Sequence, residues 1–109
     1  MPINPYRIMW LFVLYDLPVG NKQQRRAYTR FRTDLEKLGF RMFQFSVYAR
    51  VCGSVESMET HIKKVKRRLP PEGTVTIMHL TDKQFENIEH FYCRAERKKP
   101  KGNQQLEMF

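Results

Sequence analysis

The chain has 109 residues, of which 41% are hydrophobic, and this favours one folded domain over an intrinsically disordered chain. Twenty lysines and arginines against 11 acidic residues give a formal net charge of +9, which favours a polyanionic partner, nucleic acid before membrane. No apolar run approaches the roughly 18 residues of a membrane span, and residues 1–7 do not resemble a signal peptide. These features together predict a cytoplasmic protein.

The first predicted element is a strand over residues 8–15, a continuous apolar run between Pro5 and Pro18. The residues on both faces of this strand are apolar, so both faces must be buried by other parts of the protein or by a partner. The few helices expected in a chain of this length cannot cover both faces. A second copy of the chain is the simplest candidate for the remaining face.

A helix is predicted over residues 21–38, with Gly39 as the stop signal and an apolar stripe at spacings of three and four: Ala27, Tyr28, Phe31, Leu35 and Leu38. Its solvent side carries a basic stripe of Lys22, Arg26 and Arg30, flanked by Arg25 and Arg32. Like charges four residues apart slightly destabilise a helix. The stripe therefore has two interpretations, a phosphate-binding surface or an ordinary solvated face.

Residues 40–51 alternate and are typical of an amphipathic strand, either one long strand or two. One parity holds Phe43, Phe45, Val47, Ala49 and Val51, and the other holds Gln44, Ser46, Tyr48 and Arg50. No glycine, proline or asparagine marks a turn within the stretch. The periodicity by itself therefore indicates no hairpin.

A second helix is predicted to begin after Ser54, with Glu56 in its first turn and Pro70-Pro71 beyond its end. Its apolar stripe is Val55, Met58, Ile62, Val65 and Leu69. Its last turns carry a basic cluster of Lys63, Lys64, Lys66, Arg67 and Arg68. Five cations exceed what the helix dipole needs, although by itself the cluster is more typical of a solvated surface.

The remaining predicted elements are a strand over residues 73–80, a short helix around residues 84–88 capped by Thr81 or Asp82, and a possible strand at residues 90–94. Residues 1–97 then form the domain, and residues 98–109 form a polar tail whose apolar end, residues 106–109, is suited to docking on a neighbouring subunit. This order predicts an α+β, ferredoxin-like βαββαβ sandwich. Two helices would cover one face of an antiparallel sheet, and a dimer would form through the other face.

Asp16, at the end of the first strand, has two interpretations. An aspartate before Leu17-Pro18 commonly bonds nearby backbone amides in a turn. It can also hold magnesium, which prefers oxygen ligands and usually takes one or two carboxylates. One aspartate is too few for a firm site, but a two-fold dimer would supply two. No obvious general base accompanies it, and Tyr15, Ser46 and Tyr48 are neighbours only in principle.

Cys52 and Cys93 are far apart, and neither lies in a CxxC motif or beside the scattered His61, His79 and His90. Both thiols are predicted to be small buried hydrophobes, and no zinc site is expected.

The segments "VLYDLP", "RRAYTRFRTDLEKLGF", "MFQFSVYARV" and "TDKQF" occur in this order between residues 7 and 93. Together they resemble CRISPR-associated protein 2, the small adaptation subunit of CRISPR immunity, and "QFSVY" with "TDKQF" is most similar to type II versions. The resemblance implies a ferredoxin-like homodimer with a hairpin at residues 44–46. It also implies a magnesium (Mg²⁺)-dependent nuclease site at Asp16.

The same resemblance implies a partner, the larger CRISPR integrase subunit, with which the family captures spacer DNA and inserts it into the repeat array. Cleavage of single-stranded RNA or double-stranded DNA is implied too, as is a non-catalytic scaffold role. The expected nucleic-acid-binding residues are Lys22, Arg25, Arg26, Arg30, Lys63 and Arg67. A generic basic ferredoxin-like nucleic-acid-binding module without catalysis is the alternative, which the lack of a glycine-aromatic RNA-binding motif weakens.

Overall fold

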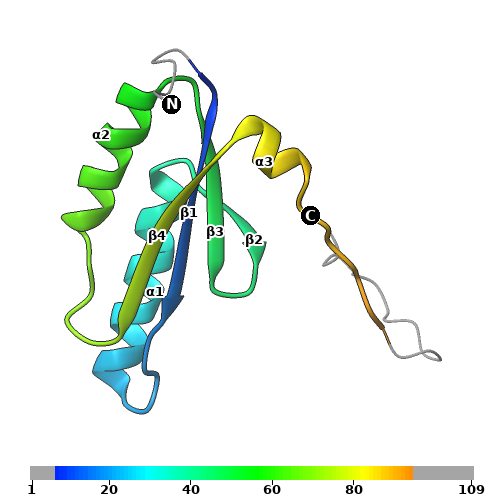
Figure 1. Ribbon diagram of the computed structural model, residues 1–109. Coiled ribbons are helices and arrows are strands. Elements are labelled where there is room, and N and C mark those ends of the chain that lie inside the picture. Colours follow the sequence, from blue (N-terminus) through cyan, green and yellow to red (C-terminus); the bar gives the residue numbers. More distant parts are fainter. Residues whose placement is uncertain (1–6, 95–109) are drawn as a thin grey trace.

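The computed structural model describes residues 7–94 as a four-stranded antiparallel sheet with two long helices against one face (Figure 1). The elements in chain order are β1 (Met9–Asp16), α1 (Lys22–Lys37), β2 (Arg41–Gln44), β3 (Val47–Cys52), α2 (Val55–Lys66), β4 (Thr74–Thr81) and α3 (Asp82–Glu86). The strand order β2-β3-β1-β4 places β1 between β3 and β4. The predicted α+β, ferredoxin-like arrangement is confirmed. The proposed tail at residues 98–109, and the domain limit at residue 97, lie outside the described residues.

The core lies between the sheet and the two long helices. Every second residue of β1 faces this layer, and Met9, Leu11 and Val13 are fully buried there. The helices contribute Phe31 and Leu35 from α1 and Met58 and Val65 from α2. Burying a side chain of this size contributes about 1.5–3 kcal/mol, so this layer accounts for much of the stability of the fold.

Local capping residues set the limits of the helices. The Asn21 side chain accepts a hydrogen bond from the Gln24 backbone N–H at 2.8 Å, and the Gln24 side chain accepts one in return from the Asn21 N–H at 3.2 Å. Ser54 caps α2 in the same way through the Ser57 N–H. Gly39 follows α1 with φ of 90°, a conformation that glycine adopts without strain. Both predicted helix starts are confirmed.

The mid-chain stretch is a hairpin, as the family resemblance implies, and not one long strand. Phe45 and Ser46 form the turn between β2 and β3, and Gln44 pairs with Val47 across it. Ser46 takes φ of 63°, the only positive φ of a non-glycine residue in the part of the chain that the structure describes. A serine thus occupies a turn position with positive φ, where glycine or asparagine is usually found.

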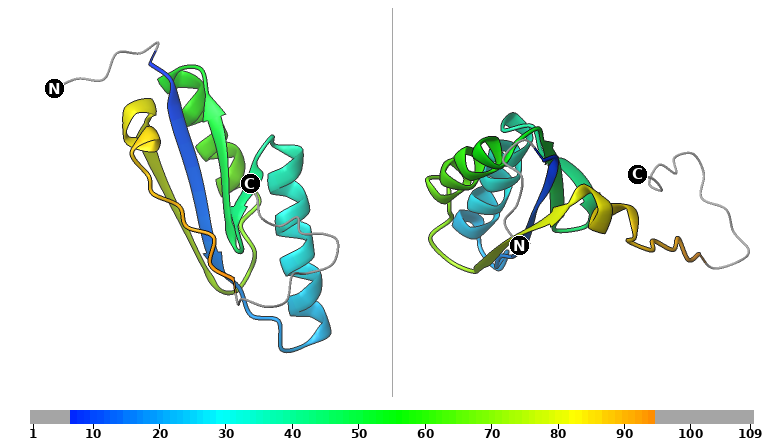
Figure 2. Two further views of the ribbon diagram at one scale, coloured as in Figure 1. Left: turned by 90° about the vertical axis from the view of Figure 1, so that its right-hand side faces the viewer. Right: turned by 45° about the horizontal axis from the view of Figure 1, so that its top comes forward.

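The face of the sheet opposite α1 and α2, here called the open face, carries Trp10, Phe12, Leu14 and Asp16 of β1. Figure 2 shows α3 on this side of the sheet, away from the two long helices. The Phe85 ring of α3 stacks on Trp10 at a centroid distance of 3.8 Å, and Trp10 Nε1 donates to Asp82 Oδ1 at 3.0 Å. The prediction that this chain cannot cover its second face is therefore wrong for Trp10 and Phe12. On the neighbouring strands this face stays apolar and accessible, because Val51, opposite Trp10, is 45% exposed and Met78, opposite Phe12, is 41% exposed.

Three smaller expectations are wrong. Residues 90–94 form no strand within the described part of the chain. Leu69 lies beyond the end of α2 and is 48% exposed, so it does not extend the apolar stripe. Cys52 is buried as predicted, and burial raises the pKa of its thiol, but Cys93 is exposed.

Candidate functional site

Asp16 is the last residue of β1, and its side chain is exposed at the end of the open face. Strand pairing places Asp16 opposite Thr74 of β4 and Leu14 opposite Thr76. These residues line an open hollow of about 250 Å³ together with Tyr15, Ser46 and Val47. Asp16 is the one carboxylate among the lining residues, which also include three residues with aliphatic hydroxyl groups: Ser46, Thr74 and Thr76.

Two backbone contacts hold the end of β1 in place. The Tyr15 N–H donates to the Ser46 carbonyl at 3.0 Å, which ties the strand end to the tip of the β2–β3 hairpin. On the other side, Gly73 takes φ of 101°, and a Cβ there would stand 2.7 Å from the Asp16 carbonyl oxygen. The backbone of Asp16 is therefore enclosed on both sides, while its carboxylate stays open to solvent. Within the described residues this carboxylate accepts no hydrogen bond, so the turn interpretation lacks the amide contacts on which it depends.

The tyrosines near Asp16 belong to the core and not to the hollow's polar surface. Tyr15 and Tyr48 are 6% and 1% exposed and lie on the helix side of the sheet, where their ring centroids are 6.1 Å apart. Burial, more than the neighbouring tyrosines, raises the pKa of Tyr15 well above its ordinary value. Tyr15 therefore stays protonated at neutral pH and is unsuited to act as a general base.

The side chains around Asp16 carry the oxygen ligands that magnesium prefers, but one chain supplies too few carboxylates for a firm site. Carboxylate and hydroxyl oxygens are hard ligands of the sort that this ion prefers, and neither histidine nor cysteine lines the hollow. Residues 7–94 contain no group of three or more histidine, cysteine, aspartate or glutamate side chains able to hold a metal ion. One described chain thus supplies a single carboxylate, half of what a two-carboxylate site would need.

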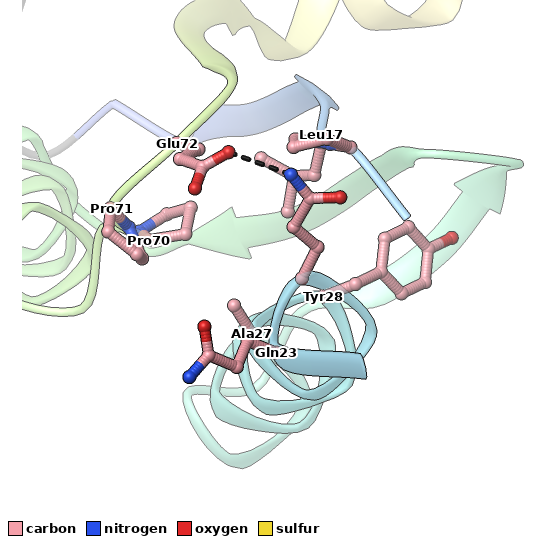
Figure 3. A pocket seen from close by; sticks show the side chains of 9 residues that line it. Leu17, Gln23, Ala27, Tyr28, Pro70, Pro71 and Glu72 are labelled. Carbon is pink, nitrogen blue, oxygen red and sulfur yellow. Dashed lines mark hydrogen bonds between the residues drawn. The ribbon is translucent and has the colours of Figure 1, made fainter. Parts of the chain in front are cut away.

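A second hollow, of about 80 Å³, lies between the start of α1 and the loop before β4 (Figure 3). Its walls are mainly apolar, with Leu17 on one side and Pro70 and Pro71 on the other. Its one carboxylate, Glu72, already accepts a hydrogen bond from Gln24 Nε2 at 2.9 Å. This contact fastens the loop before β4 to α1, and thereby supports Gly73 and the neighbouring Asp16 backbone.

The basic stripe on α1 is exposed as predicted. Lys22, Arg26 and Arg30 follow one another along the outer side of the helix, and none of the three forms an ion pair with another described residue. Arg25 Nη1 donates to the Val19 carbonyl at 3.3 Å. Figure 1 shows that α1 begins at the same end of the molecule at which β1 ends, so Lys22 and Arg25 share that end with Asp16.

The basic cluster at the end of α2 lies in the helical layer, across the sheet from the open face. Lys63 and Arg67 are exposed and, within residues 7–94, have no acidic partner. Arg68 differs, because its Nη1 lies 3.4 Å from Asp34 Oδ1 of α1. The predicted nucleic-acid-binding residues thus all lie on the two long helices, and the Arg68–Asp34 contact brings the end of α2 against α1.

Comparison with known proteins decides the family. The family model for CRISPR associated protein Cas2 matches residues 9–88, which include β1 with Asp16 and every element through α3. The chain belongs to the Cas2 family. The matched region thus contains all seven helices and strands labelled in Figure 1.

Two relatives of this Cas2-family chain are each 42% identical to it over 107 residues, or 98% of its length. They are the CRISPR-associated endoribonuclease Cas2 of Flavobacterium psychrophilum, of which 93% is covered, and that of Paracidovorax avenae, of which 99% is covered. A solved structure titled "Crystal structure of cas2" superposes with a TM-score of 0.56 at 20% identity, covering 86% of this chain and 97% of that one. At this identity the superposition supports the fold alone.

The sequence pattern missed Thr74 and Thr76, which the fold of this Cas2-family chain brings to Asp16, and it named Ser46 as a neighbour only in principle. Thr74 and Thr76 reach the hollow through the β1–β4 pairing, and Ser46 reaches it through the hairpin. Each lies at least thirty positions away from Asp16 in the chain, and Ser46 also lies in a turn that has no glycine. No local signal identifies them, because strand register is a long-range property.

No helix among the described residues is both long and apolar enough to cross a membrane.

Proposed function

We propose that this chain is a magnesium-dependent endoribonuclease that works as a homodimer, with the two Asp16 carboxylates forming one phosphodiester-cleaving site. The observation that carries the proposal is the solvent-open Asp16 carboxylate, set in a hollow of hydroxyl-bearing residues at the end of an apolar sheet face. The name endoribonuclease of relatives 42% identical supports single-stranded RNA as substrate. Loss of magnesium-dependent RNA cleavage on Asp16→Asn substitution is its test.

Within this proposal the residues of the chain have distinct tasks. Bound Mg²⁺ would neutralise charge on the scissile phosphate and lower the pKa of a coordinated water. Asp16 would supply the carboxylate for the ion, while Ser46 and Thr74 offer hydroxyls to the phosphate oxygens or to water. Tyr15 contributes structure and not proton transfer, because its pKa is raised by burial. Lys22 and Arg25 would attract the neighbouring phosphates to the same end of the molecule.

The homodimer is supported by the accessible part of the open face. Val51 lies opposite Trp10 and Met78 lies opposite Phe12 on this face, and both remain exposed, although side chains of this size are usually covered when they gather on one sheet face. A two-fold contact through this face would cover them and would bring two copies of Asp16 toward each other. Dimerisation and the metal site are thus one structural hypothesis.

Light scattering of the full chain at micromolar concentration is expected to give about twice the chain mass of 13.2 kDa. Val51→Asp and Met78→Asp should each move the mass toward that of the monomer, because a buried unpaired charge is costly. Glu59→Asp, on the exposed side of α2, is the control and should leave the dimer intact. A wild-type chain that stays monomeric and soluble would contradict the dimer, and the shared metal site with it.

A second function, a DNA-binding scaffold in spacer acquisition, is favoured by exposed cations on both helices that have no acidic partner among residues 7–94: Lys22, Arg26, Arg30, Lys63 and Arg67. In this role the protein would join the larger CRISPR integrase subunit and hold spacer DNA during its insertion into the repeat array. The family membership supports this pathway. A nucleic-acid-binding module without catalysis is the alternative, and binding without cleavage by the wild-type protein would favour it.

Changing both Arg26 and Arg30 to alanine is expected to weaken duplex DNA binding and to reduce its dependence on salt. Each lost phosphate contact should flatten the slope of log affinity against log salt by about 0.9, because fewer counterions are released on binding. Arg32→Ala is the matched control, since its guanidinium lies 3.7 Å from Glu36. An unchanged slope in the double variant would show that the stripe is only a solvated face.

A further inference from the structure

Phe45 is an exposed aromatic residue at the tip of the β2–β3 hairpin, with 79% of its surface accessible. It lies in the turn and not within a strand, and its side chain is not covered by the rest of the described chain. An aromatic side chain is a large apolar group to leave in water at a fixed position. The tip is not loose, because the Ser46 carbonyl accepts a hydrogen bond from Tyr15 of the central strand.

The backbone at the tip is strained, and the strained residue is next to Phe45 in the chain. Ser46 adopts φ of 63°, and residues held in this region by their surroundings cluster at ligand-contacting sites. Ser46 also lines the hollow that contains Asp16. The exposed Phe45 is therefore the sequence neighbour of a residue that lines the site proposed to bind a phosphate.

A single-stranded polynucleotide has two features that such a site can bind at once. Its phosphates would be attracted to a chain of net charge +9 and to a cation held by Asp16. Its unpaired bases have flat faces that can stack on an aromatic ring. Proteins that bind single strands commonly stack bases on exposed aromatic side chains, independently of sequence. Apart from Tyr15, which is buried, the residues lining the hollow are not aromatic, so Phe45 is the ring available next to it.

We propose that Phe45 is a stacking platform for an unpaired nucleobase next to the phosphate held at Asp16. This inference rests on the proposed cleavage site and names the residue that would favour a single strand there, because paired bases have no free face to offer. It also predicts little sequence preference, since every base presents an aromatic face.

The test measures binding of a short single-stranded RNA that contains 2-aminopurine, whose fluorescence falls when the base stacks. The full-length Asp16→Asn protein is used so that the probe is not cut. Phe45→Leu keeps an apolar side chain but removes the aromatic face, and it should weaken binding on the order of tenfold and abolish the quenching. Phe45→Trp should retain both the affinity and the quenching. Duplex affinity should be unchanged in every variant.

Equal affinity and equal quenching in the Phe45→Leu and parent proteins would overturn the stacking platform while leaving the cleavage site intact. A Phe45→Leu protein that loses its dimer mass in light scattering would also overturn it, since Phe45 would then contact a second copy of the chain. If the wild-type protein neither binds nor cuts single-stranded RNA, the proposed function itself fails, and this inference fails with it.

Discussion

Replacing Asp16 by asparagine is expected to lower magnesium-dependent cleavage of single-stranded RNA by a hundredfold or more, on the order of what one electrostatic group supplies in such sites. Asparagine keeps the shape of aspartate but removes the negative charge that the ion requires. The fold should survive, because the carboxylate is exposed and accepts no hydrogen bond within the described residues. The measurement is the cleavage rate at saturating magnesium, with the dimer mass and duplex affinity as checks on integrity.

Glu72→Gln is the matched control for this experiment. It also removes one negative charge near the start of α1, but its carboxylate contacts Gln24 and not the Asp16 hollow. Cleavage by Glu72→Gln should therefore stay close to that of the wild type. If both variants lose activity equally, a general electrostatic effect and not metal binding is responsible. Unaltered cleavage in Asp16→Asn would return Asp16 to the role of a turn residue.

The same Asp16→Asn protein separates the two proposed functions. In a reconstituted reaction with the integrase subunit, spacer insertion that continues without cleavage would assign the scaffold role to this protein and make hydrolysis dispensable there. Insertion that is lost together with cleavage would make hydrolysis part of the pathway. Nucleic-acid affinity itself should hold or rise slightly, because one anion per chain has gone from near the phosphates.

The parts of the fold that could be predicted from the sequence are those set by local chemistry. Asn21 and Ser54 cap the two long helices through side-chain contacts with residues three positions on, and such signals are visible in the sequence. The apolar run of β1 likewise predicts a central strand from composition alone. These elements need no knowledge of the rest of the chain.

The hairpin and the facing of β3 could not be predicted locally. Ser46 turns the chain with a positive φ that tertiary contacts hold in place. The residues that usually mark such a turn in a sequence, glycine and asparagine, are absent. The alternation of residues 40–51 also favours the wrong side as the core. Tyr48 is buried toward the helices, and Arg50 Nη1 donates to the Leu38 carbonyl at 2.7 Å there, although both belong to the more polar parity. The opposite parity is apolar because it forms the open face.

The candidate site was predictable only as far as Asp16 itself. A carboxylate at the end of a buried strand stands out in the sequence, as does a basic stripe on the following helix. The neighbours of Asp16 come from β4 and the hairpin, and their approach depends on register. The cover that α3 gives to Trp10 is equally non-local, because Phe85 lies 75 residues away from Trp10 in the sequence.

Gly73→Ala is expected to lower the free energy of unfolding by about 2–5 kcal/mol. An alanine at φ of 101° is strained by about 1–2 kcal/mol, and its Cβ would stand 2.7 Å from both the Asp16 carbonyl oxygen and Leu17 Cδ2. Crowding of this kind typically costs a further 1–3 kcal/mol. Urea unfolding measures the change, at one fixed protein concentration because the stability of a dimer depends on concentration.

The position of Gly73 joins this stability effect to function. Relief of the contact requires the Asp16 backbone or Leu17 to move, so RNA cleavage should fall even at temperatures where the Gly73→Ala protein remains folded. Gly53→Ala is the matched control, because a Cβ at Gly53 would meet nothing within 4 Å and its φ is not positive. That variant should change stability by less than about 0.5 kcal/mol and leave cleavage unaltered. A Gly73→Ala protein that is destabilised yet fully active when folded would show that the exact placement of the Asp16 backbone does not matter for cleavage.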